Sequence, residues 1–258
     1  MNIVIIGSGN IATHLAKSFV NQGHDIVEVY SKTSANAKTL ADAVYAYTFT
    51  TTFESLNLKA DLYLIAVADS AITDVIDELP DSIEGLVIHT SGATPLDILA
   101  KFKAYGVIYP PQSINKNIET DLSKIPFGIE GNTKEVQDIL FNFMQALAPK
   151  TFICNSKQRL ALHISAVLVN NFPNALYQIA NDILQKENLK FDLIKPIILE
   201  TAQKVQTHLP ELVQTGPAIR NDLNTIDKHL QFLSYSKELS EIYQILTDFI
   251  IKRHLKSD

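Results

Sequence analysis

The chain opens with a short apolar run that leads directly into a glycine-rich turn. Residues 2–6 read as a buried strand, and residues 7–12 carry the spacing G-x-G-x-x-A before a helical pattern begins. Gly7 permits a sharp turn, Gly9 leaves the backbone open to a pyrophosphate, and Ala12 lets the helix pack closely on the strand. The residues expected to hold the phosphates are Gly7, Ser8, Gly9, Asn10 and Ile11.

This spacing is weak evidence by itself, because an ordinary turn between a strand and a helix can carry it and bind nothing. Here the turn follows a buried-type strand and opens a helix expected over residues 13–22, which is the context that dinucleotide binding requires. The free amides and the dipole at the start of that helix both favour a bound phosphate. We interpret residues 7–12 as a dinucleotide-binding turn and keep the plain turn as the alternative.

The end of the second strand, expected over residues 25–30, distinguishes two kinds of dinucleotide. In NAD-binding proteins an acidic residue about 20 residues beyond the glycines holds the ribose 2′-hydroxyl. That place is taken by Ser31, Lys32 and Thr33, whereas Glu28 comes too early and lies inside the strand. Two hydroxyls and an ammonium group suit a 2′-phosphate, so the sequence predicts NADP(H) rather than NAD(H). The alternative is a solvated loop that contains a lysine.

Strand and helix patterns alternate through the first half of the chain. Apolar strands are expected over residues 61–67 and 86–89, and such alternation gives a parallel sheet covered by helices on both faces. Ligands of these sheets bind beyond the carboxyl ends of the strands. For residues 89–94 the alternative is a simple helix cap at Thr94. The turns after these strands add Val67, Ala68, Ser91 and Gly92 to the cofactor-binding candidates.

The remaining part of the first half extends the same sheet. Residues 109–113 include two prolines and form a stiff link that the sequence does not place. We expect an α/β domain with a doubly wound sheet over residues 1–154. Its further elements are strands at residues 106–108, 126–129 and 151–153 and a helix at residues 133–147.

From residue 156 onwards helical periodicity replaces the strand patterns, so we expect an all-helical domain over residues 155–258. Its first helix is expected over residues 157–186, broken or bent near Pro173, which lacks an amide hydrogen. The segment 160–168 is apolar nearly all round and predicts a buried helix. Further helices are expected over residues 191–206, 217–233 and 236–253.

A few polar residues interrupt that apolar helix. At about 100° per residue, Arg159, His163, Asn170 and Asn174 fall on one stripe. Burying such groups is costly unless they are paired, so a cleft that uses them explains the stripe. The alternative is a set of hydrogen bonds between helices. Because histidine titrates near neutral pH, His163 is a candidate proton donor and Asn170 a candidate for orienting the substrate.

A second polar group marks the expected start of the helix over residues 217–233. Arg220, Asn221 and Asp222 are adjacent there. A helix N-terminus beside an arginine suits a carboxylate, so Arg220 is the third candidate catalytic residue. The alternative is a solvated first turn in which Asp222 complements the helix dipole.

Composition narrows the classes of partner and compartment. The net charge of −6 argues against a nucleic-acid partner, because neutralising phosphates needs a basic surface. No apolar run is long enough to span a membrane, and we expect no signal peptide, because no basic segment or cleavage site is found ahead of the first strand. The single cysteine, Cys154, excludes a disulfide framework, and no histidines or carboxylates show metal-ligand spacing. We expect a cytoplasmic protein without a metal.

Four motifs spread over nearly the whole chain are specific enough to compare with known families. They are residues 7–12, residues 89–93, residues 158–163 with Asn170-Asn171, and residues 215–222. Together they resemble a family of bacterial proteins with a Rossmann-like domain followed by a domain of unknown function. That family is similar to 6-phosphogluconate dehydrogenase in its helical domain. Pyrroline-5-carboxylate reductase, ketopantoate reductase and the deazaflavin-dependent NADP oxidoreductases are related to it.

The resemblance implies an NADP-binding domain and a homodimer joined through the helical domains, with substrate bound between domains. The dehydrogenases of this group commonly use a lysine on the long helix, with an asparagine four residues further on. Here no lysine lies between Lys157 and Lys186, and His163 and Asn170 occupy a comparable helix. The lysine-based mechanism therefore does not transfer to this chain.

Two hypotheses of different class follow. The first is an NADPH-dependent oxidoreductase that reduces a small carbonyl or imine carboxylate, with a ketopantoate-like 2-oxo acid favoured over a pyrroline-carboxylate-like imine. In it, Ser91 and Gly92 lie near the nicotinamide, His163 gives a proton and Arg220 binds the carboxylate of the substrate. The second is an NADP-binding sensor or scaffold without turnover, which the missing lysine favours.

Overall fold

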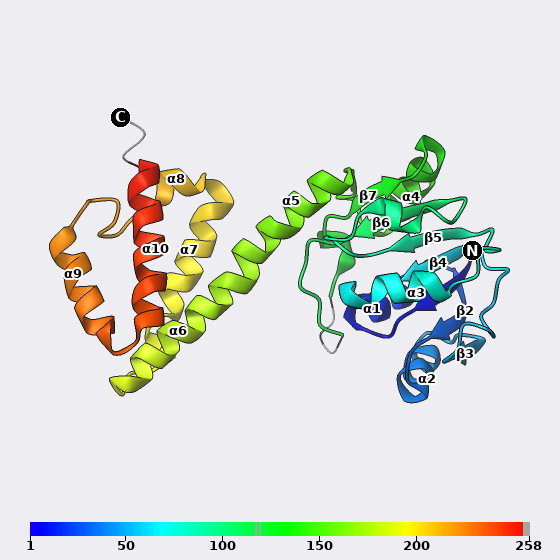
Figure 1. Cartoon of the computed structure of the whole chain (residues 1–258), viewed down its shortest axis with the longest axis horizontal. Coiled ribbons are helices and arrows are strands. Elements are labelled where there is room, and N and C mark those ends of the chain that lie inside the picture. The colour runs from blue at the N-terminus through cyan, green and yellow to red at the C-terminus, as the bar shows by residue number, and fades with distance from the viewer. Residues whose placement is uncertain (117, 119, 255–258) are drawn as a thin grey trace. The chain divides into compact units, whose positions relative to one another are not determined.

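The computed structural model describes all residues except 117, 119 and 255–258. The chain divides into two compact units, residues 1–172 and 173–258. The first unit contains a single sheet with helices, and the described part of the second unit contains helices and turns without a strand (Figure 1). The predicted fold class, a doubly wound Rossmann-like sheet followed by a helical part, is confirmed. The predicted domain boundary at residue 155 stays a prediction, since the compact units divide further on, inside the long helix.

Eight strands form one sheet. They are β1 (Asn2–Ile6), β2 (Asp25–Tyr30), β3 (Thr48–Thr50), β4 (Leu62–Ile65), β5 (Leu86–His89), β6 (Tyr105–Tyr109), β7 (Gly128–Gly131) and β8 (Phe152–Ile153). Their order in the sheet is β3-β2-β1-β4-β5-β6-β7-β8. Neighbouring strands are parallel except β6 and β7, which are antiparallel. The chain reverses its direction of winding between β1 and β4, which is where ligands of such sheets bind.

Helices cover both faces of this sheet. They are α1 (Asn10–Asn21), α2 (Ser34–Ala43), α3 (Ile72–Glu78) and α4 (Lys134–Leu147). Successive side chains of a strand point to opposite faces, so β1 serves two cores. Ile3 and Ile5 pack with α1, α2 and α4, whereas Val4 and Ile6 pack with α3. This double burial explains why β1 is apolar at every position after Asn2.

The long helix predicted over residues 157–186 is continuous and contains a wider turn. α5 (Ser156–Ala166) passes through a π-helical turn, η4 (Val167–Asn171), into α6 (Phe172–Lys186). Pro173 is the second residue after that turn. It cannot donate to a carbonyl one turn back, and its ring crowds the same carbonyl. A wider turn is one way for a helix to relieve this conflict. The predicted break at Pro173 is therefore a π turn just before it.

The prediction that residues 160–168 are buried is wrong for the single chain. Leu160, Ile164 and Leu168 are 41%, 52% and 54% exposed. Hydrophobic periodicity indicates that a helix face avoids water, but it does not say which surface covers that face.

Four further helices make up most of the second unit. They are α7 (Lys195–Thr207), α8 (Pro210–Val213), α9 (Leu223–Phe232) and α10 (Lys237–His254). The helix predicted from residue 217 begins only at Leu223. Asn221 has a left-handed φ of 50°, and the Asp222 carboxylate accepts a hydrogen bond from the Thr225 amide, so Asp222 is the cap. None of the described helices is both long and apolar enough to cross a membrane.

Candidate active site

The glycine turn after β1 has the shape that its spacing predicts. Gly7 has a φ of 121°, and a side chain there would overlap the carbonyl oxygen of Ala66. At Gly9, by contrast, nothing lies within 4 Å of the place where a side chain would be. Gly9 also precedes α1, whose first turn has no side-chain cap. The turn therefore offers open space beside uncapped amides, which is the cradle that a phosphate needs.

A cavity of about 310 Å³ lies at this turn. It gathers loops that follow three neighbouring strands, β1, β4 and β5, as the sequence predicts for one shared crevice. Of the predicted cofactor-binding residues, Gly9, Asn10, Ile11, Val67 and Ala68 lie together on its wall. The full lining is Gly9, Asn10, Ile11, Ala66, Val67, Ala68, Thr90 and Ile114.

The end of β2 lacks a carboxylate of the kind that holds a ribose hydroxyl. The Ser31 and Ser8 hydroxyls are 2.8 Å apart, which joins this end of the sheet to the glycine turn. Lys32 and Thr33 follow and are exposed to solvent. Glu28 is buried and accepts a hydrogen bond from the Asn57 amide at 2.7 Å, and burial raises the pKa of its carboxyl group. Glu28 is therefore already bonded inside the fold and does not face a ribose. The exposed side chains at this end are the ammonium of Lys32 and the hydroxyl of Thr33.

Ser91 and Gly92, in the turn after β5, have different roles. The Ser91 hydroxyl accepts hydrogen bonds from the Ala93 and Thr94 amides at 3.2 and 2.9 Å, so it shapes the turn from inside. A side chain at Gly92 would lie 2.7 Å from both His163 Nδ1 and Tyr109 Cε2. Gly92 thus allows an imidazole from α5 to lie against the backbone at the end of β5.

His163 lines a second cavity, of about 360 Å³, also within the first unit. Its Nδ1 lies 3.1 Å from the Tyr109 hydroxyl at the end of β6. Asn170, another predicted site residue, lines the same cavity through the π turn. The full lining is Tyr109, Pro111, Gln112, Ser113, His163, Ala166, Val167, Val169, Asn170 and Asn171.

The stiff link that the sequence did not place connects the two cavities. Residues 111–113 line the cavity of His163, and the next residue, Ile114, lines the cavity of the glycine turn. The Asn10 side chain accepts a hydrogen bond from the Lys116 amide, which ties the end of this link to α1. The two prolines were the only signal of a rigid wall here, and they did not reveal which side chains it presents.

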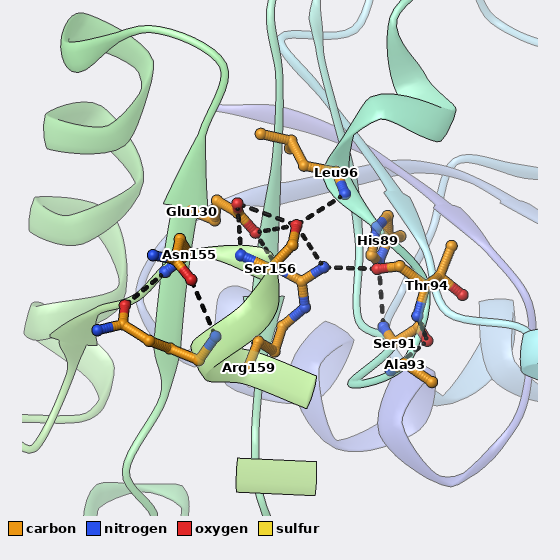
Figure 2. A network of polar contacts seen from close by, with 10 residues as sticks. His89, Ser91, Ala93, Thr94, Leu96, Glu130, Asn155, Ser156 and Arg159 are labelled. Atoms are coloured by element: carbon orange, nitrogen blue, oxygen red, sulfur yellow. Dashed lines mark hydrogen bonds and ion pairs between the residues drawn. The ribbon is translucent and has the colours of Figure 1, made fainter. Parts of the chain in front are cut away.

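Arg159 belongs to a buried network at the start of α5, shown in Figure 2. It is 1% exposed and forms an ion pair with Glu130 of β7. Its other guanidinium nitrogen donates to the Thr94 carbonyl, and the Ser156 amide and hydroxyl donate to Glu130 (Figure 2). The first turn of α5 is therefore attached to β7 and to the turn after β5. Because His163 lies one turn further along α5, this network sets its position.

His89, at the end of β5, is fully buried near this network. Its Nδ1 accepts a hydrogen bond from the Ser91 amide at 3.1 Å. Burial, and after it the positive charge of Arg159, lowers the pKa of His89 to about 4. The side chain is therefore neutral at physiological pH and serves the turn rather than proton transfer.

The four-residue polar stripe is divided by the tertiary structure. Arg159 points into the network, and His163 and Asn170 share a cavity. Asn174 lies in the second unit, beside Tyr177 and other polar residues of α6. A π turn takes more residues than an α turn, so a count of about 100° per residue fails across residues 167–171.

Arg220 lies in the second unit, in the turn before α9, and is exposed there. Asp222 caps α9, and its hydrogen bonds from Thr225 lower the pKa of its carboxyl group. Among the described residues, no group of three histidines, cysteines or carboxylates could hold a metal ion.

The chain is similar to known proteins in both sequence and fold. Residues 2–91 match the model of a family described as NADP oxidoreductase, coenzyme F420-dependent, and residues 125–250 match a domain of unknown function, DUF2520. The structure of a protein described as an NADP oxidoreductase from Bacteroides fragilis is 37% identical, with a TM-score of 0.85, over 97% of this chain and 98% of that one. The chain belongs to the same NADP oxidoreductase family as this Bacteroides fragilis protein.

Other solved structures share the fold of this NADP oxidoreductase at lower identity. A 1-pyrroline-5-carboxylate reductase from Streptococcus pyogenes is 17% identical, with a TM-score of 0.60, over 98% of each chain. A reductive aminase from Aspergillus terreus, solved with NADPH and ethyl-5-oxohexanoate, is 14% identical, with a TM-score of 0.75, over 98% of this chain and 94% of that one. No curated protein matches by sequence. The family confirms NADP(H) as the cofactor of the oxidoreductase.

Proposed function

We propose that this NADP oxidoreductase is a reductase of a small carbonyl or imine compound that carries a carboxylate. A ketopantoate-like 2-oxo acid is the first candidate substrate, and a pyrroline-carboxylate-like cyclic imine is the second. The observation that carries the proposal is the contact between His163 and Gly92. It brings a proton-donating side chain to the end of β5, two residues from Thr90 in the proposed cofactor cavity.

In this proposal the two cavities have separate tasks. The glycine turn and Val67-Ala68 hold the dinucleotide, while Ser31, Lys32 and Thr33 hold its 2′-phosphate. When bound, NADPH supplies the hydride that reduces the substrate. His163 gives the proton to the substrate oxygen or nitrogen, and Asn170 orients the substrate. Arg220, an exposed arginine whose guanidinium suits a carboxylate, is the proposed ligand of the substrate carboxylate.

Membership in an oxidoreductase family favours this proposal over a sensor without turnover. Two relatives of the same fold support the substrate class. One is named as a 1-pyrroline-5-carboxylate reductase, and the other is a reductive aminase solved with a keto ester. Both reactions reduce a carbon joined to oxygen or nitrogen by a double bond, which is the chemistry that a hydride donor and a nearby acid can perform.

The experiment is NADPH oxidation against a panel of 2-oxo acids, cyclic imines, and ketones mixed with amines. We expect turnover of at least one carboxylate substrate. His163→Asn should then lower kcat by about 10²–10⁴-fold, the usual contribution of a general acid. Ser165→Ala is the matched control on the same helix, since Ser165 is exposed and bonds only to the Ala161 carbonyl within the described chain.

Two outcomes would contradict the proposal. Tight binding of NADPH with no oxidation across the whole panel would favour the sensor. Unchanged turnover in both His163→Asn and Arg220→Ala would mean that the site is assigned to the wrong residues.

We also propose a homodimer joined through the helical part. Only four residues of the described second unit are buried, namely Ala218, Ile226, Leu233 and Thr247. Ile197, Leu212 and Ile245 are 61%, 71% and 67% exposed. A helical unit of this size with so small a core does not bury enough apolar surface to be stable by itself, so a second copy of the chain is the proposed cover.

A further inference from the structure

Tyr109 contacts His163 at the head of the larger cavity. It ends β6, is 5% exposed and lines the cavity. Its hydroxyl lies 3.1 Å from Nδ1 of His163, and the two rings meet edge to face with centroids 5.9 Å apart. No described residue bonds to the other ring nitrogen, Nε2.

The geometry of this pair is held from a third side. A side chain at Gly92 would lie 2.7 Å from His163 Nδ1 and 2.7 Å from Tyr109 Cε2. Three separate segments therefore pack against one another here, namely the turn after β5, the end of β6 and α5. The Nδ1 edge of the imidazole is closed in by Gly92 and Tyr109, so Nε2 is the nitrogen left for a substrate in the cavity.

We propose that Tyr109 is a positioning residue that fixes the tautomer of His163 and replaces the proton that His163 gives up. The phenol donates its hydrogen to Nδ1, and Nε2 therefore carries the hydrogen that is offered to the substrate. This inference rests on the proposed reductase function and extends it to a residue that the sequence did not indicate.

The direction of the hydrogen bond follows from the chemistry of the two groups. An imidazole nitrogen is far more basic than a neutral phenol oxygen, so the phenol is the donor. Burial, and after it the negative charge of Asp69, raises the pKa of Tyr109, while the positive charge of Arg159 acts in the opposite direction. The phenol therefore keeps its hydrogen at neutral pH. The guanidinium of Arg159 favours a phenolate when one forms.

The Nε2–H bond of His163 breaks as the substrate O–H or N–H bond forms, and the Tyr109 O–H bond breaks as an Nδ1–H bond forms. The substrate carbon is reduced and NADPH, the reductant, is oxidised to NADP⁺. Nε2 then takes a proton from solvent water, which leaves as hydroxide, and the Nδ1 hydrogen returns to the phenolate. Both the Nε2–H imidazole and the neutral phenol are thereby restored after a full cycle.

The first test needs no substrate. In protein labelled with ¹⁵N at histidine, the ring nitrogen shifts at alkaline pH report the tautomer, and His163→Gln identifies the signal of His163 among the seven histidines. We expect the Nε2–H form in the wild type and a mixture of both forms in Tyr109→Phe. A wild-type His163 in the Nδ1–H form, or an unchanged tautomer in Tyr109→Phe, would overturn the proposal.

The second test is the pH dependence of kcat with whichever substrate the panel identifies. At acid pH an imidazolium carries its own spare proton, so Tyr109→Phe should stay within about threefold of the wild type. At alkaline pH the variant should fall by about 10–100-fold, a part of what general acid catalysis contributes. Tyr105→Phe, at the other end of β6, is the matched control and should follow the wild type at every pH.

A uniform loss of kcat at all pH values would instead indicate a structural role for the Tyr109 hydroxyl and would contradict the proposal. If no substrate is found, the reductase proposal fails, and the tautomer measurement still decides the role of Tyr109. The phenylalanine variant keeps the ring that packs on Gly92. Its circular dichroism and Tm should therefore match those of the wild type before either test is interpreted.

Discussion

Lys32 is the residue whose proposed role depends least on the rest of the site. It is exposed, follows β2 directly and stands where NAD-binding proteins carry a carboxylate. Loss of a hydrogen bond to a charged group costs about 1.5–3 kcal/mol. Lys32→Ala should therefore raise the KM for NADPH by about 10–100-fold and leave the KM for NADH nearly unchanged. Lys38→Ala, an exposed lysine on α2, is the control, and an unchanged NADPH preference in Lys32→Ala would contradict the assignment.

His89 predicts how the stability of the first unit depends on pH. Its pKa is about 4 in the folded protein and near 6.5 for a free side chain, so the unfolded chain binds more protons between these values. Its contribution to the free energy of unfolding is therefore complete above pH 6.5 and is lost as the pH falls towards 4. The loss should be about 3 kcal/mol. Urea unfolding at pH 7 and pH 4 measures it, and a His89→Leu variant should show a smaller difference between the two pH values.

The start of α5 is the element on which the position of His163 depends. Removing one partner of a buried ion pair leaves the other charge buried and costs about 3–5 kcal/mol. Glu130→Ala should therefore lower the free energy of unfolding by about that amount, because Arg159 remains in the interior. Urea unfolding measures the change. The exposed pair between Lys134 and Asp138 provides the control, and Lys134→Ala should cost less than about 1 kcal/mol. Equal effects of the two variants would mean that the buried network does not hold the helix.

Elements were predictable where the deciding interactions are local. The strands at residues 25–30 and 86–89 match β2 and β5 in both bounds, because their apolar runs are short and end in polar turns. β3 was missed because it is only three residues long and mostly exposed. The predicted start of α9 is wrong because Pro217 and Asp222 both suit a helix start. In the structure the Thr225 amide donates to the Asp222 carboxylate, so the helix begins after Asp222.

At the scale of the whole molecule the exposed apolar helices call for a partner. We expect light scattering to give twice the chain mass of 28.7 kDa. Ile245→Asp with Phe249→Asp should produce a monomer or an unstable protein, since both side chains are more than half exposed in the single chain. Lys252→Asp is the control, because it places an aspartate at another exposed position of α10. This variant should remain a dimer. A stable wild-type monomer with the same Tm at all concentrations would contradict the homodimer.

The sequence by itself determined the doubly wound first part, the helical second part and the cofactor turn. Each of these depends on a local pattern, such as a period of two or 3.6 residues or the absence of a side chain at one glycine. Only the tertiary structure decided the partners of the polar residues. It joined Arg159 to Glu130, left His163 against Gly92 and brought in Tyr109, which no spacing marks. The physical reason is that the three segments around His163 are far apart in the chain. They are the turn after β5, the end of β6, and α5, which comes after the antiparallel strand β7. Their meeting depends on how whole elements fill space, which hydrophobic periodicity does not record.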